Sequence, residues 1–323
     1  MPAKPAAAKP KSNELHLARV YDAPVAAVWD AWTDPAQAAK WWGPRGFTIT
    51  THSKDLRPGG HWAYTMHGPD GTDYPNKAIY FEVEPQRKLV YDHGGSDDRP
   101  PLFRVTVLFE EIDGQTHMDM TMSFATPEVA REMVKFIKQA GGNATWDRLA
   151  EYLEEESTGK QKFVINRTFD APRDVLFDMW TKPEHFTRWL TPAGFEMKLD
   201  RADVRPGGSA FYSMWNDSGL KMHGRLEYQQ INLPHRIVYT QQSCDEHESI
   251  IRHPLAPIWP ETLLITVELA EEGPDATRVT LTWEPYGQAT PEEIAAFVKE
   301  RPGMTQGWTG SFDKLEAILA GAN

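Results

Sequence analysis

Apolar and polar residues alternate along many short stretches of this chain. Two neighbouring stretches show the alternation clearly, with apolar residues at every second position: Phe103, Val105, Val107 and Phe109, then Met118, Met120, Met122 and Phe124. Successive side chains of a strand point to opposite faces of its sheet, so the alternation predicts antiparallel strands with one apolar and one polar face. Turn residues such as Gly114 separate the stretches, as hairpins require.

Other stretches carry apolar residues at the three- and four-residue spacing of an amphipathic helix. One helix is expected up to about residue 32 with Pro24 in its first turn, and a second short helix follows the break at Asp34-Pro35. A closing helix carries an apolar stripe that includes Trp146 and Leu149. The predicted order is one strand, two short helices, about six strands and a closing helix.

The whole pattern occurs twice. Residues 22–46 recur as residues 170–194, at a constant spacing of 148. The residues with an identical partner at this spacing include Asp22, Pro24, Trp32, Thr33, Pro35, Trp41, Gly46 and Phe47. The turn Arg-Pro-Gly-Gly at 57–60 returns at 205–208, and the second copy ends in a helix that starts with the capping box Thr290-Pro291-Glu292-Glu293. Such a repeat indicates a duplicated domain, since solenoid repeats run to about 20–50 residues.

A sheet with one apolar face and a helix with one apolar stripe bury each other when the stripe packs on the face. The sequence therefore predicts an α+β fold in two copies, and a chain of 323 residues also exceeds the size of a single core. We expect a disordered tail over residues 1–12, a first domain over 13–156, a linker over 157–161 and a second domain over 162–320.

Composition and charge narrow the classes of function. A net charge of −12 argues against nucleic acid as a partner, because nucleic-acid-binding proteins need a basic surface. No stretch has the roughly 20 apolar residues that cross a bilayer, and no N-terminal apolar run resembles a signal sequence, so no membrane insertion is expected. The one cysteine, Cys244, cannot form an internal disulfide, which favours a cytoplasmic protein.

Motifs for cofactors and metals are missing from the sequence. It has no phosphate-binding loop, no dinucleotide fingerprint and no HExxH motif, so we expect no cofactor. Cys244, His247 and His253 stand in an insertion of the second copy, but structural metal sites usually show paired close spacings and four ligands. We expect an exposed polar loop there and no metal.

The apolar face of each predicted sheet also carries tyrosines and tryptophans, whose hydroxyl or indole N–H needs a partner when it is buried. A solid core is the ordinary outcome of such a face, but these polar groups favour a cavity for an apolar ligand. The candidate ligand-binding residues are Trp32, Trp62, Tyr64, Met66, Tyr80, Met120, Met122, Trp180, Tyr212, Met214, Tyr228, Trp283 and Trp308.

Each copy resembles the activator-of-Hsp90-ATPase-like family of the START/Bet v 1-like superfamily. The resemblance rests on the order of a strand, DAPxxxxxxxWTxPxxxxxW, RPGG, a run of strands and a closing helix with Gly307-Trp308, Phe312, Asp313 and Leu315. It implies helix-grip domains, each a curved antiparallel sheet with two short helices and a long C-terminal helix around a hydrophobic cavity. Relatives include co-chaperones that stimulate the Hsp90 ATPase, and wider superfamily members bind lipids or cyclise polyketides.

A catalytic role would need titratable groups within hydrogen-bond reach of a substrate. No nucleophile–base pair can be identified among the polar candidates near a pocket mouth, which are Arg57, Tyr64, His67, Arg205, Tyr212 and His223. We therefore expect no catalytic residue and predict that the protein binds a hydrophobic small molecule, such as a lipid or an aromatic compound. The alternatives are a protein-interaction role with a chaperone, like that of the Hsp90 co-chaperones, and a polyketide cyclase-like enzyme.

The two copies differ at two bulky positions. Trp62 aligns with Ala210, whereas Trp308 aligns with Gly142. Our hypothesis is that these positions approach each other between sheet and helix, so that the two interiors are filled from different sides and their pockets differ in shape. Four other tryptophans are expected to anchor the short helices against one end of the sheet: Trp32, Trp41, Trp180 and Trp189.

Overall fold

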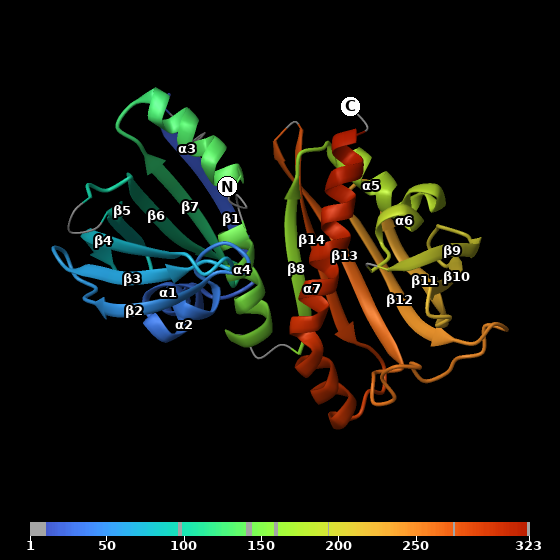
Figure 1. The fold of residues 1–323 in the computed structure, drawn as a ribbon. Coiled ribbons are helices and arrows are strands. Elements are labelled where there is room, and N and C mark those ends of the chain that lie inside the picture. The colour runs from blue at the N-terminus through green and yellow to red at the C-terminus, as the bar shows by residue number, and fades with distance from the viewer. Residues whose placement is uncertain are drawn as a thin grey trace. The chain divides into compact units, whose positions relative to one another are not determined.

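The computed structural model describes residues 11–95, 99–139, 144–157, 161–192, 194–273 and 275–321. The chain divides into two compact units, Met1–Thr158 and Gly159–Asn323, each with its own sheet and its own core. We name them unit 1 and unit 2 and describe each by itself (Figure 1).

The elements of unit 1 follow the predicted order through the seventh strand, after which two described helices stand where one closing helix was predicted. The elements are β1 (Glu14–Tyr21), α1 (Val25–Thr33), α2 (Pro35–Trp41), β2 (Thr48–Lys54), β3 (His61–His67), β4 (Asp73–Glu84), β5 (Lys88–Gly95), β6 (Phe103–Ile112), β7 (Gln115–Ser123), α3 (Pro127–Gln139), α4 (Ala144–Tyr152) and a π-helical turn (Leu153–Ser157). The seven strands form one antiparallel sheet in the order β1-β7-β6-β5-β4-β3-β2.

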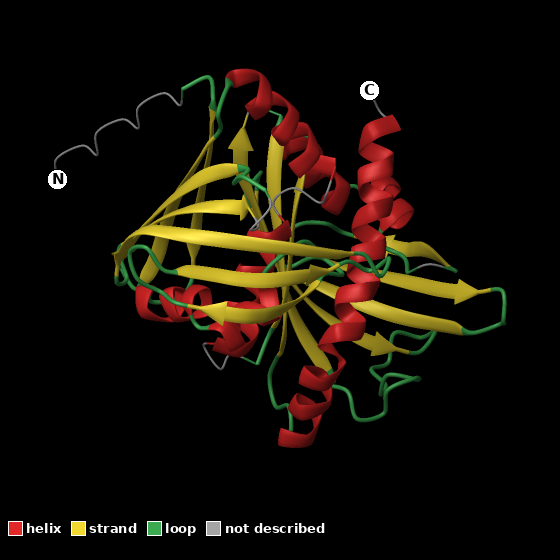
Figure 2. Ribbon diagram, turned by 60° about the vertical axis from the view of Figure 1, so that its left-hand side comes forward, coloured by secondary structure: helices red, strands yellow, loops and turns green. Residues whose placement is uncertain are grey.

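Unit 2 repeats the same topology. Its elements are β8 (Phe163–Phe169), α5 (Arg173–Thr181), α6 (Pro183–Trp189), β9 (Phe195–Ala202), β10 (Ser209–Asn216), β11 (Lys221–Asn232), β12 (Arg236–Cys244), β13 (Thr262–Gly273), β14 (Ala276–Pro285) and α7 (Pro291–Gly321). The sheet order is β8-β14-β13-β12-β11-β10-β9, and α7 runs as one long helix (Figure 2). The predicted α+β fold with two curved antiparallel sheets and a long C-terminal helix is confirmed.

The predicted apolar sheet faces point into the cores. In β6 and β7 of unit 1, Val107 pairs with Met120 across the strands, and both are buried. The intervening Leu108 is exposed on the other face. In unit 2, Val267 and Leu281 form the equivalent buried pair. Burial at every second position confirms the strand periodicity.

Two tryptophans anchor the short helices in the same way in both units. Trp41 Nε1 donates to the carbonyl oxygen of Ala31 at 3.0 Å, and Trp189 Nε1 donates to the carbonyl oxygen of Met179 at 3.0 Å. Each bond joins the second short helix to the first, and both indoles are fully buried. These bonds hold the two short helices together, and the predicted anchoring against one end of the sheet stays a prediction.

A basic side chain ties the closing helix to the segment after the short helices in each unit. Arg148 of α4 donates to the carbonyl oxygen of Gly43 at 2.9 Å. Lys314 of α7 donates to the carbonyl oxygen of Thr191, the equivalent position, at 2.7 Å. The duplicated fold thus keeps the hydrogen bond while the cation changes from guanidinium to ammonium.

The capping box predicted at the start of α7 is confirmed. Thr290 N donates to the Glu293 carboxylate at 2.9 Å, and Glu293 N donates to Thr290 Oγ1 at 3.2 Å. These two bonds satisfy backbone groups that the first turn of a helix leaves unpaired. Among the described residues, no helix combines the length and the apolar character needed to cross a membrane.

Two local expectations are wrong. Pro24 precedes α1 as its N-cap and does not occupy its first turn, because a ψ of 151° makes its backbone extended. Cys244 does not lie in an exposed loop with His247: it ends β12, opposite His223, and is 1% exposed. Because Cys244 pairs with a residue of the neighbouring strand, it lies within the sheet and is shielded from solvent.

Candidate functional site

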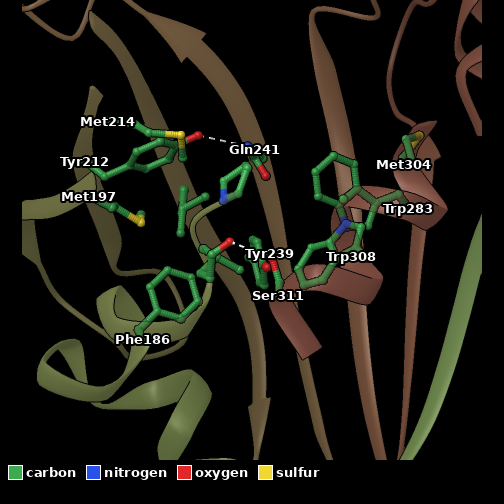
Figure 3. Close-up of a pocket in the computed structure, with 14 residues that line it drawn as sticks. Phe186, Met197, Tyr212, Met214, Tyr239, Gln241, Trp283, Met304, Trp308 and Ser311 are labelled. Atoms are coloured by element: carbon green, nitrogen blue, oxygen red, sulfur yellow. Dashed lines mark hydrogen bonds between the residues drawn. The ribbon is translucent and has the colours of Figure 1, made fainter. Parts of the chain in front are cut away.

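Unit 2 contains a cavity of about 230 Å³ between the inner face of its sheet and α7 (Figure 3). It is lined by Phe186, Leu190, Pro192, Met197, Tyr212, Met214, Leu226, Tyr239, Gln241, Trp283, Met304, Gly307, Trp308 and Ser311. Gly307 lines the cavity and is itself exposed, so the opening lies beside α7. An apolar and aromatic lining with a few polar groups is typical of small-molecule sites.

Tyr212 and Gly224 shape one wall of this cavity. The two residues are paired across β10 and β11, and the tyrosine ring lies over the glycine. A Cβ at position 224 would come within 2.2 Å of Tyr212 Cζ and Oη, so only glycine leaves room for the ring. Gln241 Nε2 of β12 donates to Tyr212 Oη at 2.9 Å (Figure 3). The phenol is therefore fixed across three strands.

The corresponding tyrosine of unit 1, Tyr64, is packed differently. Its ring stacks on Trp62 with the centroids 4.2 Å apart, and Trp42 Nε1 donates to its hydroxyl at 3.1 Å. The residue opposite Tyr64 in β4 is Asn76 and not glycine. Two indoles therefore surround Tyr64, and burial raises the pKa of its hydroxyl well above the ordinary value.

Unit 2 replaces these neighbours with smaller residues. The positions 148 residues after Trp42, Trp62 and Asn76 carry Leu190, Ala210 and Gly224. A leucine and an alanine in place of two indoles leave volume beside Tyr212. Leu190 and Tyr212 line the cavity, whereas Ala210 does not.

The polar groups of the cavity are neutral hydrogen-bonding groups. Burial raises the pKa of Tyr212 to about 12, although the hydrogen bond from Gln241 opposes the shift. Burial also raises the pKa of Tyr239 far above its ordinary value, so both phenols keep their protons at neutral pH. Ser311 Oγ donates to the carbonyl oxygen of Leu190 at 3.1 Å. In the described part of the chain, no group of His, Cys, Asp and Glu side chains is placed to hold a metal ion.

The family profile of activator of Hsp90 ATPase homolog 1-like proteins matches residues 22–154 and, again, residues 170–320. The chain belongs to this family. It carries two copies of the family domain, one in each unit. The resemblance expected from the repeated motif is confirmed, and the cavity lies in the second family domain.

Solved structures resemble the chain either over about one family domain or over nearly its whole length. A protein from Nitrosomonas europaea is 24% identical and covers 46% of this chain and 99% of its own, with a TM-score of 0.42. A protein from Arthrobacter aurescens is 27% identical and covers 45% and 87%, with a TM-score of 0.42. The di-domain ARO/CYC BexL from the BE-7585A biosynthetic pathway is 14% identical and covers 94% and 97%, with a TM-score of 0.39. Comparison with curated proteins gave no significant match.

The structure brings together part of the predicted ligand-binding set in the second family domain. Four of its members line the cavity: Tyr212, Met214, Trp283 and Trp308. Trp180 and Tyr228 are buried but do not line it. Trp180 packs on Trp189 with centroids 4.4 Å apart, and Tyr228 packs on Tyr239 with centroids 5.9 Å apart.

The predicted set of the first family domain contributes to the core of unit 1. Its members there are Trp32, Trp62, Tyr64, Met66, Tyr80, Met120 and Met122. Trp32 stacks on Trp146 of α4 with centroids 5.2 Å apart, which joins the short helices to the closing helix. A ligand-binding role for this set stays a prediction.

Most of the polar candidates for a pocket mouth lie away from the cavity. Arg57 and Arg205 are exposed and form ion pairs beside the two Arg-Pro-Gly-Gly turns. His67 lies at the surface, bonded to a neighbouring aspartate, and His223 stacks on a phenylalanine. Of this set, Tyr212 lines the cavity of unit 2.

Ten of the lining residues were not predicted from the sequence: Phe186, Leu190, Pro192, Met197, Leu226, Tyr239, Gln241, Met304, Gly307 and Ser311. Several stand where the two copies disagree. Leu190 takes the place of Trp42, and Gln241 takes the place of His93. A comparison of the two copies at every buried position would have pointed to the lining residues that differ between them.

The hypothesis about Trp62 and Gly142 stays a prediction, because Gly142 lies outside the described residues. Trp62 is buried at 2% exposure, as the hypothesis requires. In unit 2, Trp308 lines the cavity, and Ala210 is buried without lining it.

Proposed function

We propose that unit 2 binds a hydrophobic small molecule in its cavity and does not catalyse a reaction on it. The observation that supports the proposal is the cavity of about 230 Å³ with its apolar and aromatic lining. An apolar cavity of about 150 Å³ suffices for benzene, so this volume suits a compact molecule of about two fused rings. No Asp, Glu, Lys, Arg or His stands among the fourteen lining residues, so the lining supports binding more than acid–base chemistry.

A side chain added at Gly307 tests the proposal. A Cβ built there meets no atom within 4 Å, so a side chain can begin at this position beside the opening. We expect Gly307→Leu to weaken the binding of two-ring aromatic compounds about tenfold, which corresponds to about 1.4 kcal/mol. Isothermal titration calorimetry measures the affinity, after a thermal-shift panel of fatty acids and aromatic compounds has identified compounds that stabilise the wild type.

Gly310→Leu is the matched control. Gly310 lies one turn further along α7, its Cβ also meets no atom within 4 Å, and it does not line the cavity. Both substitutions replace glycine with a better helix former, so a difference between them reports on the opening. Equal binding by Gly307→Leu and Gly310→Leu, or a wild type that no compound stabilises, would refute the proposal.

The protein-interaction role with a chaperone, the polyketide cyclase-like role and the cytoplasmic location stay predictions. Cys244 is buried and unpaired, which agrees with a reducing compartment. A pull-down from lysate tests the interaction role, and product analysis with a linear polyketide tests the cyclase role.

A further inference from the structure

One tyrosine that lines the cavity has a hydroxyl without a hydrogen-bond partner among the described residues. Tyr239 stands in the centre of β12, is 3% exposed and lines the cavity. Among the described residues, no group donates to or accepts from its hydroxyl; its nearest aromatic neighbour, Tyr228, contributes a ring contact only. Because a buried tyrosine hydroxyl usually has a partner, this one is available to a molecule in the cavity.

A second donor on the same wall has no partner either. Trp283 lines the cavity, and its Nε1 is buried without an acceptor among the described residues. Tyr239 and Trp283 flank Ile265 in one cross-strand row over β12, β13 and β14, so both rise from the inner sheet face. Tyr212 Oη accepts from Gln241 Nε2, and this bond does not use the Tyr212 O–H donor. This wall of the cavity therefore offers hydrogen-bond donors that no described group uses.

The lining has no charge that could compensate a charged ligand. Its fourteen residues include no Lys or Arg to pair with a carboxylate and no Asp or Glu to pair with an ammonium group. A buried ion without a partner is strongly disfavoured. A ligand fully inside this cavity is therefore neutral.

From these features we infer that the ligand of unit 2 is a compact, uncharged ring compound with a carbonyl, ether or phenol oxygen that accepts a hydrogen bond from Tyr239. The inference rests on the proposed function and names the chemistry of its ligand. Water can hydrate the Tyr239 hydroxyl in the free protein, but a bound hydrocarbon would displace that water and leave the donor unpaired. A ligand that brings its own acceptor avoids this loss.

Three probes of nearly the same size separate these possibilities. Tetralin is a two-ring hydrocarbon, 1-tetralone has the same skeleton with one carbonyl oxygen, and 1-naphthoate carries a carboxylate. By isothermal titration calorimetry with the wild-type chain, we expect 1-tetralone to bind about five- to tenfold more tightly than tetralin, as one additional hydrogen bond allows. We expect 1-naphthoate to bind most weakly of the three.

Removal of the hydroxyl then assigns the effect to Tyr239. In Tyr239→Phe, the affinity for 1-tetralone should fall to that for tetralin, while tetralin binds at least as tightly as it does to the wild type. Tyr228→Phe is the matched control, because Tyr228 is equally buried on the neighbouring strand but does not line the cavity. It should keep the wild-type preference for the ketone.

The outcomes separate a failure of this inference from a failure of the proposed function on which it rests. Equal wild-type affinities for tetralin and 1-tetralone, tightest binding of 1-naphthoate, or a ketone preference that survives in Tyr239→Phe would each overturn the inference while the proposed function stands. Binding of none of the three probes would overturn the proposed function and, with it, the inference.

Discussion

Lys54 is a cation held against the aromatic core of unit 1. Its Nζ lies 4.0 Å from the centroid of the Trp62 ring and donates to the carbonyl oxygen of Trp32 at 3.0 Å. Burial lowers the pKa of Lys54 to about 7, and the negative charge of Asp34 offsets only part of this shift. The equivalent position of unit 2 is Ala202, so only the first copy carries this charge.

This residue makes the stability of unit 1 depend on pH. Between pH 7 and 10.5, the unfolded chain holds the Lys54 proton and the folded protein does not, so the free energy of unfolding rises with pH across this window. We expect Lys54→Met to be more stable than the wild type at pH 7, with a difference that shrinks toward pH 10.5. Urea unfolding of both proteins at several pH values measures it.

Lys54→Arg is the control for this prediction. Arginine keeps its charge over the whole window, so the variant should remain less stable than the wild type at pH 10.5, where the wild-type lysine has become neutral. Wild-type and Lys54→Met curves that run parallel from pH 7 to 10.5 would contradict the interpretation.

At the scale of the element, α7 is a helix of 31 residues that contains Pro302 and the glycines at 303, 307 and 310. Glycine and proline weaken a helix interior, so this helix depends on its packing and its cap. Phe297, Phe312 and Leu315 are fully buried along it, and the capping box closes its first turn. The burial of these three side chains and the N-terminal cap therefore stabilise the helix.

Gly310→Ala should therefore stabilise unit 2. The added Cβ meets no atom within 4 Å, and alanine loses less conformational entropy than glycine in a helix, so we expect a gain of about 0.5–1 kcal/mol. The urea midpoint measures the change, and an unchanged slope of the transition shows that only stability has changed. A loss of stability would mean that the position is more crowded than the structure shows.

At the scale of the whole molecule, each unit has a complete sheet and a complete core. We therefore expect fragments 1–158 and 159–323 to fold separately, each with a cooperative thermal transition in scanning calorimetry. Since all fourteen lining residues belong to unit 2, we expect 1-tetralone to raise the melting temperatures of fragment 159–323 and of the full chain alike. A fragment that stays unfolded would show that the units need each other.

Much of the fold could be predicted because its signals are local. Alternation along β6 and β7 placed Val107 and Met120 inside, and the paired breaks at Asp34-Pro35 and Lys182-Pro183 mark the short helices in both copies. Far less of the cavity could be predicted. Gly224 matters because the ring of Tyr212 lies over it, and that contact joins two strands whose register the periodicity of one strand does not reveal.

The sequence by itself determined that the protein consists of two copies of one family domain, because repeated motifs and apolar periods can be identified without coordinates. Only the tertiary structure decided that Leu190, Tyr239 and Gln241 line a cavity while Trp180 and Tyr228 do not. Four of these five positions carry large apolar or aromatic residues that suit an interior, and the fifth is Gln241. Whether they enclose space or fill it depends on how side chains from distant strands and helices fit together, and that fit is a property of the packed domain.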